Sequence, residues 1–384
     1  MGEGIGMAKV VISGYYGFDN LGDEAVLFSI LKTLRELRLG LRIEVLSNKP
    51  DQTEDIYKVS ASNRWQLREV YGALKDADML ISGGGSLLQD VTGLKSLIYY
   101  LGVIWLAQRM GKPVFFYAQG IGPVNTPFGR FLMRLVVNSV NLITVRDESS
   151  REDLAGMEIN RPRIEVTADP VLGLEEKYVD KKIGQEILGQ AGLDLSIEKR
   201  MVGISVRQWQ ELVDYKKVVA ELGDKLSRLG YQVVFLPMHY PDDLKTSQET
   251  AALMEQPAVV LEGHYSVVEM ASLIANMDLL VSMRLHALIL AAVMHVPPVA
   301  ISYDPKIDRF MGLLGRTAAT PVDKPEFADL WAAVDEVISE PWLVREELIQ
   351  EIEPLRQRAQ ASALLAIQVL EKSLKKDEPA AKYL

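Results

Sequence analysis

The chain of 384 residues contains no cysteine, so it forms no disulfide, offers no thiolate nucleophile and binds no metal through sulfur. This absence is typical of a protein from a reducing compartment. Basic residues are also fewer than acidic ones. The chain has 42 Lys and Arg against 52 Asp and Glu, which gives a net charge of −10. A nucleic-acid binder needs a basic surface. We therefore expect no nucleic acid as a partner, and we expect any basic site to be local.

Membrane signals are weak as well. The first eight residues lack the basic and apolar regions of a secretory leader, and we expect a cytoplasmic protein. The longest apolar run, around 285–299, contains two histidines and two prolines and falls short of the ~20 residues that cross a bilayer. One group of residues could form a helix that contacts the inner face of the plasma membrane: Phe128, Arg130, Phe131, Leu132 and Arg134. The alternative is that these residues form a buried helical face.

Short apolar runs of strand length alternate with segments of helical periodicity along the whole chain, which is typical of parallel sheets flanked by helices. The expected strands are 10–14, 43–47, 79–82, 114–118, 142–145 and 164–167 in the first half, and 202–206, 232–236, 259–261, 279–282 and 299–302 in the second. We predict an α/β fold of two Rossmann-like doubly wound domains, residues 1–185 and 186–384, which face a cleft. Helices between about 342 and 375 are expected to pack back on the junction.

Ligands of open α/β sheets bind beyond the carboxyl ends of the strands. The first expected strand ends there in a glycine-rich turn, Gly14–Glu24, whose backbone N–H groups suit an anion or a polar sugar. Its glycines do not match G-x-G-x-x-G and no P-loop lysine follows, which disfavours a nucleotide. Tyr15, Asn20 and Glu24 are the candidate ligand contacts. The alternative is a plain turn with Asn20 and Asp23 as helix caps.

Two further turns of the first half lie at the same kind of edge. Three successive glycines, with Gly84 and Gly85 as the candidates, let the main chain approach a ligand before an expected helix. Arg146 directly follows an apolar strand. It either contacts the ligand or forms a surface ion pair with Asp147 or Glu148.

Three cations follow three separate strands of the second half: Arg207, Arg284 and Lys306. Because the carboxyl ends of parallel strands share one edge, we expect these side chains to converge there. Arginine binds carboxylates and phosphates through two parallel hydrogen bonds, and lysine adds a point charge. A small ligand that carries both groups, such as phosphoenolpyruvate, would satisfy the set.

Histidines supply the candidates for proton transfer. His286 lies beside Arg284 and is the first candidate for acid/base work, with a role as helix cap as the alternative. His239 also follows a strand, and plain loop polarity explains it at least as well. His264 and His295 are assigned structural roles. The four histidines lack the spacing of a zinc site, so we expect no metal and no resident cofactor.

Taken in their order along the chain, these motifs resemble the polysaccharide pyruvyl transferase family, and its branch linked to cell-surface anchoring of S-layer proteins in particular. The resemblance covers about residues 9 to 310. It rests on five segments: Gly14–Glu24, Gly83–Ser86, Gln119–Pro123, Arg146–Asp147 and Ser282–His286.

The resemblance implies a pair of Rossmann-type domains of the glycosyltransferase-B kind (GT-B). It implies an enzyme that forms a pyruvate ketal on a sugar from phosphoenolpyruvate and releases phosphate, with a lipid-linked disaccharide as acceptor. By motif, the donor would contact Arg207, Arg284, Leu285, His286, Lys306 and Arg146. The Tyr15–Glu24 loop would face the acceptor.

Two other functions stay open on the sequence. One is a GT-B glycosyltransferase that takes a nucleotide-sugar donor, which predicts an acidic ribose-binding residue where the second half offers cations. The other is a non-catalytic binder of anionic glycans or lipid head groups. The oligomeric state is not predicted.

Overall fold

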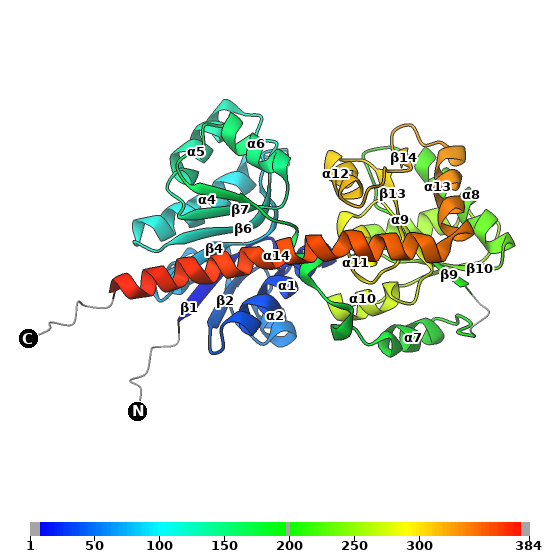
Figure 1. Cartoon of the computed structure of the whole chain (residues 1–384), viewed down its shortest axis with the longest axis horizontal. Coiled ribbons are helices and arrows are strands. Elements are labelled where there is room, and N and C mark those ends of the chain that lie inside the picture. The colour runs from blue at the N-terminus through cyan, green and yellow to red at the C-terminus, as the bar shows by residue number, and fades with distance from the viewer. Residues whose placement is uncertain (1–7, 92, 197–199, 378–384) are drawn as a thin grey trace, which may run out of the picture. The chain divides into compact units, whose positions relative to one another are not determined.

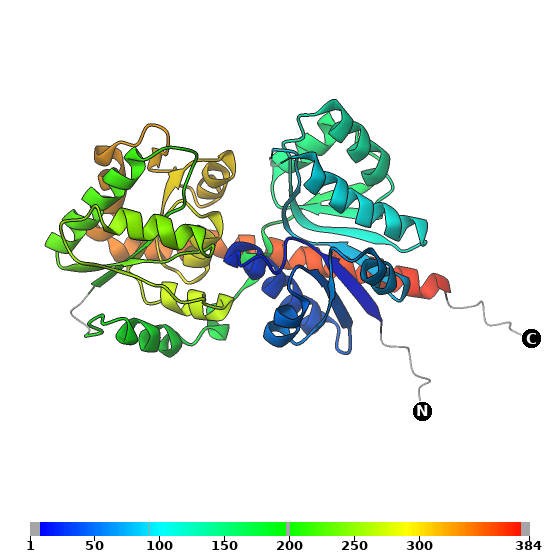
Figure 2. The same cartoon turned by 180° about the vertical axis from the view of Figure 1, so that it is seen from behind.

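The computed structural model describes residues 8–91, 93–196 and 200–377 (Figures 1 and 2). Most of the segment on which the leader expectation rests, residues 1–7, lies outside this range. The contacts between backbone segments divide the chain into two compact units. Unit 1 holds the residues up to 18, residues 23–173 and the residues from 356 onward, and unit 2 holds residues 19–22 and 174–355.

The sheet of unit 1 is parallel, with the strand order β3-β2-β1-β4-β6-β7-β8, and β5 pairs with β6 at its end. Chain order reverses between β1 and β4, which is the switch point of a doubly wound sheet. The strands are β1 (Lys9–Ser13), β2 (Arg42–Ser47), β3 (Ser60–Asn63), β4 (Met79–Ser82), β5 (Gly85–Leu88), β6 (Val114–Ile121), β7 (Leu142–Val145) and β8 (Arg163–Val166).

Helices cover both faces of this sheet. One apolar core joins the sheet to α3, α4, α5 and α6, while Figure 1 draws α1 and α2 on the other face. The helices are α1 (Leu21–Leu37), α2 (Pro50–Tyr57), α3 (Leu67–Lys75), α4 (Leu94–Arg109), α5 (Pro127–Val137) and α6 (Glu148–Gly156).

Unit 2 repeats the same plan. Its parallel sheet has the order β11-β10-β9-β12-β13-β14, and its switch point lies between β9 and β12. The strands are β9 (Arg200–Ser205), β10 (Tyr231–Phe235), β11 (Ala258–Val260), β12 (Leu279–Ser282), β13 (Pro298–Ser302) and β14 (Thr320–Pro321). The 3-10 turn Pro170–Gly173 still belongs to unit 1. The helices of unit 2 are the 3-10 turn Glu176–Tyr178, then α7 (Lys181–Gln190), α8 (Asp214–Arg228), α9 (Asp242–Ala251), α10 (Val267–Ile274), α11 (Leu285–Val293), α12 (Pro305–Leu313) and α13 (Phe327–Ser339).

The chain ends in one helix, α14 (Pro341–Asp377), which contributes to both units. In unit 2, Val344 belongs to the core formed with α8 and α13. In unit 1, the Ser362 hydroxyl lies 2.8 Å from the Thr167 hydroxyl and 3.0 Å from that of Thr144. Among the described residues no helix has both the length and the apolarity that crossing a bilayer requires.

The fold class predicted from the sequence is confirmed, and every predicted strand overlaps a strand of the structure. Three short strands, β3, β5 and β14, were not predicted. β3 reads Ser-Ala-Ser-Asn and lies at the sheet edge, so it carries no apolar run. The glycine turn after β4 leads into β5, where we expected a helix, because Gly85 and Leu88 pair with β6. The units divide at 173/174, before the predicted boundary at 185/186.

The turns at the switch point of unit 1 are packed around one buried side chain, Tyr16. It is fully buried, and a Cβ built on Gly83 would lie 2.1 Å from its Oη atom. The same Cβ would be 3.2 Å from the ring carbon Cζ, so the hydroxyl group makes the clash. Glycine is therefore required at position 83, because the Tyr16 hydroxyl approaches it so closely.

We expect Gly83→Ala to lower the free energy of unfolding by about 1–3 kcal/mol, because the core must be overpacked to hold the new methyl group. The double variant Gly83→Ala/Tyr16→Phe should recover most of that loss, since it removes the atom that clashes. Urea unfolding measures both values.

Gly102→Ala is the matched control, because nothing lies within 4 Å of its added Cβ on the exposed side of α4. This control should be neutral or stabilising by up to about 1 kcal/mol. An equal loss in the single and double variants would show that the Tyr16 hydroxyl is not the constraint.

Candidate functional site

The candidate site of unit 2 lies at the carboxyl edge of its sheet. β9 and β12 are paired neighbours in register, and beyond their last paired residues the Met283 N–H donates to the Ser205 carbonyl at 2.9 Å. Arg207 and Arg284 each lie two residues after the last residue of these strands. Strand pairing thus delivers both arginines to the switch point, where open α/β sheets bind their ligands.

Arg207 and Lys306 meet at one aromatic ring, that of Tyr303. The Nη1 atom of Arg207 donates to the Tyr303 hydroxyl at 3.0 Å, and its guanidinium carbon lies 4.8 Å from the ring centre. Lys306 Nζ lies 5.5 Å from the same centre and 3.3 Å from Asp304. Among the described residues the buried Nε of Arg207 has no hydrogen-bond partner. An acceptor supplied by a ligand would complete this guanidinium.

Arg284 is held by a buried carboxylate, that of Asp243. Its Nε donates to Asp243 Oδ2 at 2.8 Å and its Nη2 donates to Oδ1. Oδ2 also accepts the backbone N–H of His239 at 3.0 Å. The pair uses one edge of the guanidinium, so Asp243 fixes the direction of Arg284. Leu285, the first residue of α11, is buried.

His239 and His286 lie beside the segment 19–22, which belongs to unit 2 by its contacts. Asn20 and His239 form an antiparallel β-bridge. A Cβ built on Gly22 would lie 2.3 Å from His286 Nδ1, so only glycine allows this close approach. His286 is half-buried one residue into α11. Part of the predicted acceptor loop therefore lies against both candidate histidines.

The structure brings two of the three cations that we expected to converge to one aromatic ring. Arg207 and Lys306 share Tyr303, whereas Arg284 forms its ion pair with Asp243. Arg284 is also the N-cap residue of α11, and its side chain makes no capping hydrogen bond. The amino end of α11 therefore keeps N–H donors at the sheet edge, where the helix dipole favours an anion.

In unit 1 the predicted loop residues have local partners. The Tyr15 ring is stacked on Phe18, with the ring centres 4.0 Å apart. Glu24 accepts the Gly17 N–H at 2.8 Å and the Tyr57 hydroxyl at 2.6 Å. Burial, and then the Glu24 charge, raise the pKa of Tyr57 well above its usual range. Glu24 thus shapes the glycine turn, while the Tyr15 ring stays half-buried.

Arg146 lies in a buried network of unit 1. Its Nη1 donates to Asp169 at 3.1 Å and its Nη2 to the Ser86 hydroxyl at 3.1 Å. Both charged side chains are nearly inaccessible. The Nε of Arg146 also lies 3.7 Å from Asp147, one of the two partners that we considered, so Arg146 is paired with two carboxylates and its own side chain is buried rather than on the surface. Gly84 packs against α1, and Gly85 begins β5 next to this network.

A cluster that the sequence analysis missed lies at the carboxyl edge of β3. Arg64 is buried, and its Nη1 donates to the Gly14 carbonyl at 2.6 Å. Its guanidinium carbon lies within 5.2 Å of four ring centres, those of Phe18, Trp65, Tyr99 and Tyr100. We call these five residues the Arg64 cluster. Cation–π attraction stabilises the charge there.

The Arg64 cluster has a solvent-facing side. Trp65 is 61% exposed, although its Nε1 donates to Asn48 at 2.7 Å. Burial raises the pKa of Tyr100 to about 12, while Arg64 acts in the opposite direction. The tyrosine therefore stays neutral and the cluster keeps a net positive charge. An exposed indole above a buried cation is a surface suited to a sugar ring.

The described part of the chain contains no group of three or more His, Asp or Glu side chains that could hold a metal ion. The Asp-x-Asp sequence at 76–78 serves the backbone, because Asp78 accepts the Lys9 N–H at 2.7 Å at the amino edge of the sheet.

Comparison with known proteins gives one family and one fold. Residues 20–305 match the protein family described as "Polysaccharide pyruvyl transferase". The chain is also similar to the amylovoran biosynthesis protein AmsJ of Erwinia amylovora, at 21% identity over 364 residues that cover 80% of this chain and 86% of the relative.

Solved structures with similar folds include proteins bound to UDP, to UDP-GlcNAc and to UDP-glucose. Staphylococcus aureus MnaA with UDP superposes with a TM-score of 0.67 at 12% identity, over 97% of this chain and 99% of the other. The UDP-GlcNAc 2-epimerase of Neisseria meningitidis gives 0.62 at 14% identity, over 95% and 100%. Anabaena HepE with UDP-glucose gives 0.57 at 14% identity, over 96% and 98%. At these identities the likeness shows a GT-B-like fold alone.

We expect Asp243→Asn to lower the free energy of unfolding by about 3 kcal/mol, because it leaves the mostly buried Arg284 charge without its counterion. The neighbour Asp242 provides the control, since its side chain is exposed. Asp242→Asn should change the value by less than about 0.5 kcal/mol. Urea unfolding compares the two, and equal values would mean that the ion pair does not hold this edge together.

Proposed function

This chain belongs to the polysaccharide pyruvyl transferase family, and from that premise we propose that it transfers the pyruvyl group of phosphoenolpyruvate to a sugar of a lipid-linked cell-wall glycan precursor. The family makes it a transferase of polysaccharide biosynthesis. The donor, the ketal product and the lipid-linked acceptor are our proposal. So is the branch linked to S-layer anchoring.

One observation carries the proposal for the donor: at the switch point of the second sheet, the buried Nε of Arg207 has no partner among the residues that the structure describes. Arg207 and Lys306, which both lie near the Tyr303 ring, would bind one anionic group of phosphoenolpyruvate. The amino end of α11 would meet the other. A nucleotide sugar would instead call for an acidic ribose partner, and this edge presents cations.

The proposed reaction needs no resident cofactor. A proton adds to the methylene carbon of phosphoenolpyruvate, which makes C2 electrophilic. One sugar hydroxyl adds to C2 and loses its proton. The C2–O bond to phosphate then breaks, and a second hydroxyl adds to C2 and loses its proton. The products are a pyruvate ketal with a new methyl group and inorganic phosphate, so atoms and charges balance.

The described residues have distinct roles in this scheme. His286 transfers a proton, as the acid at the methylene carbon or as the base at a hydroxyl. Arg207 and Lys306 stabilise the charge of the leaving phosphate, because preorganised donors cost no reorganisation during the reaction. Arg284, fixed by Asp243, orients the donor carboxylate beside His286.

The acceptor is proposed to bind along the Tyr15–Glu24 loop and the exposed side of the Arg64 cluster. Trp65 and the stacked pair of Tyr15 and Phe18 offer aromatic faces to a sugar ring. Within unit 2, Asn20 of this loop is bridged to His239, so both add polar groups to the loop. Arg146, which lies buried with Asp169, supports β5 and the Gly84–Gly85 turn.

Direct binding of phosphoenolpyruvate, measured by calorimetry with the full chain, tests the donor without knowledge of the acceptor. We expect 1:1 binding in which phosphate competes. Arg207→Lys should weaken binding about tenfold to a hundredfold, because the forked, charge-assisted contact is lost. Lys177→Ala, an exposed lysine of unit 2, is the control. Binding of a UDP-sugar but not of phosphoenolpyruvate would support the glycosyltransferase instead.

Phosphate release in the presence of candidate glycan acceptors tests the catalytic step. His286→Asn should lower kcat by about 10²- to 10⁴-fold and change the affinity for phosphoenolpyruvate little. Unchanged turnover in this variant would remove His286 from the mechanism. Binding without phosphate release for any acceptor would support a non-catalytic binder.

A further inference from the structure

The outer face of α5 has an unusual composition for the surface of an acidic chain. The inner face of α5 packs Met133, Val136 and Val137 into the core of unit 1. The outer face should then be polar. Its apolar side chains are instead exposed to 54% at Phe128, 51% at Phe131 and 60% at Leu135.

The charged residues of α5 itself are all basic. α5 contains Arg130 and Arg134 but neither Asp nor Glu. Arg134 is paired with Glu158 at 2.5 Å, while Arg130 is exposed and its Nε donates to the Val124 carbonyl. A chain with a net charge of −10 thus keeps a helix that is apolar and basic on its solvent side.

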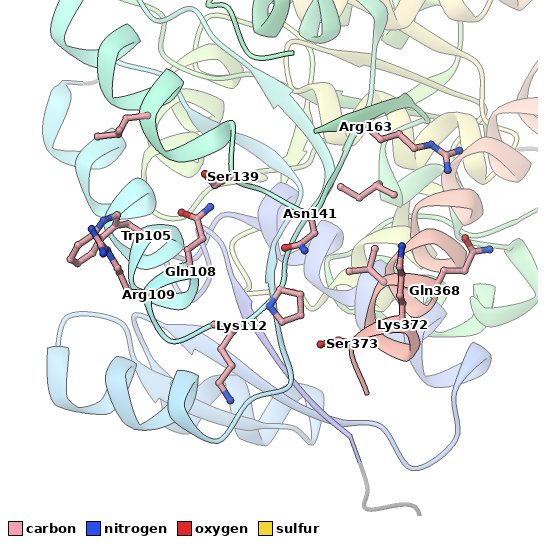
Figure 3. A pocket seen from close by; sticks show the side chains of 15 residues that line it. Trp105, Gln108, Arg109, Lys112, Ser139, Asn141, Arg163, Gln368, Lys372 and Ser373 are labelled. Carbon is pink, nitrogen blue, oxygen red and sulfur yellow. The ribbon is translucent and has the colours of Figure 1, made fainter. Parts of the chain in front are cut away.

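A groove of about 1020 Å³ continues the same surface at the amino edge of the first sheet. Four cations line it, and none of the described residues that line it is Asp or Glu. Figure 3 shows Arg109 and Lys112 on one side of the groove and Arg163 and Lys372 on the other. Arg163 is paired with the exposed Glu165, which leaves a surplus of positive charge.

Aromatic and apolar side chains border this groove. Trp105 is 46% exposed, and the guanidinium carbon of Arg109 lies 5.2 Å from its ring centre. Leu135 joins the groove to the outer face of α5. Tryptophan beside basic side chains is typical of the interface between a bilayer and water.

We propose that this surface, the outer face of α5 together with the groove, docks unit 1 on the anionic head groups of a lipid bilayer. The exposed apolar side chains of α5 enter the outer part of the acyl layer, and the groove cations contact lipid phosphates. Both kinds of contact are needed, because a few exposed apolar residues or a few charges alone bind membranes weakly. This inference does not depend on the donor chemistry.

Sedimentation of the full chain with vesicles tests the proposal. We expect binding to phosphatidylcholine mixed with phosphatidylglycerol, little binding to phosphatidylcholine alone, and weaker binding at high salt. Lys112→Glu/Lys372→Glu should bind anionic vesicles at least about thirtyfold more weakly, since each basic side chain near the surface contributes about 1 kcal/mol. Phe128→Ser/Phe131→Ser should lose binding to a similar degree.

Matched controls come from exposed side chains of unit 2. Lys217→Glu/Lys245→Glu carries the same change of charge, and Trp342→Ser/Leu343→Ser removes exposed apolar surface of similar size. Both controls should bind like the wild type, and all variants should keep its thermal transition.

Two outcomes would overturn the proposal. One is a wild-type chain that ignores anionic vesicles, or surface variants that bind them as the controls do. The other is self-association of the wild type that Phe128→Ser/Phe131→Ser abolishes in sedimentation, which would assign the surface to a second copy of the chain.

Discussion

Parallel pairing of β9 with β12 is the interaction on which the candidate donor site depends. These strands are distant in sequence, and their pairing brings Arg207 and Arg284 to the same stretch of sheet edge. The reversal of strand order at this point also opens the sheet edge to ligands. β13, the next strand along, adds Tyr303 and Lys306. Backbone hydrogen bonds thus position these cations at one edge of the sheet, where a bound anion would supply acceptors for them.

The second determinant is the way in which these charges are restrained. Asp243 neutralises and orients Arg284 from the buried start of α9, and the same carboxylate holds the backbone of His239. The segment 19–22 then lies against His239 and His286 through Asn20 and Gly22. The proposed proton transfer and anion binding would therefore depend on one connected set of contacts in unit 2. The Arg64 cluster is a separate feature of unit 1 with its own buried cation, and we propose it as the recognition surface for the acceptor.

Much of the fold, and the residues at the carboxyl edges of the sheets, could be predicted because the sequence carries two strong signals. Apolar runs such as Val202–Val206 identify buried parallel strands, and polar residues directly after them lie at the carboxyl edge. The Arg284–Asp243 pair and the Arg64 cluster could not be predicted from the sequence. Asp243 is 41 residues before Arg284 in sequence, and β3, which positions Arg64, is a polar edge strand without an apolar run. Contacts between distant segments of polar sequence leave no periodic pattern.

Diffraction from crystals grown with phosphoenolpyruvate tests the central claim most directly, because it locates the anion. We expect its phosphate and carboxylate oxygens within hydrogen-bonding distance of Arg207, Lys306 and the first N–H groups of α11, with the methylene carbon facing His286. Electron density for the donor on Arg64 or Arg146 of unit 1, with the carboxyl edge of β9 and β12 unchanged, would contradict this account.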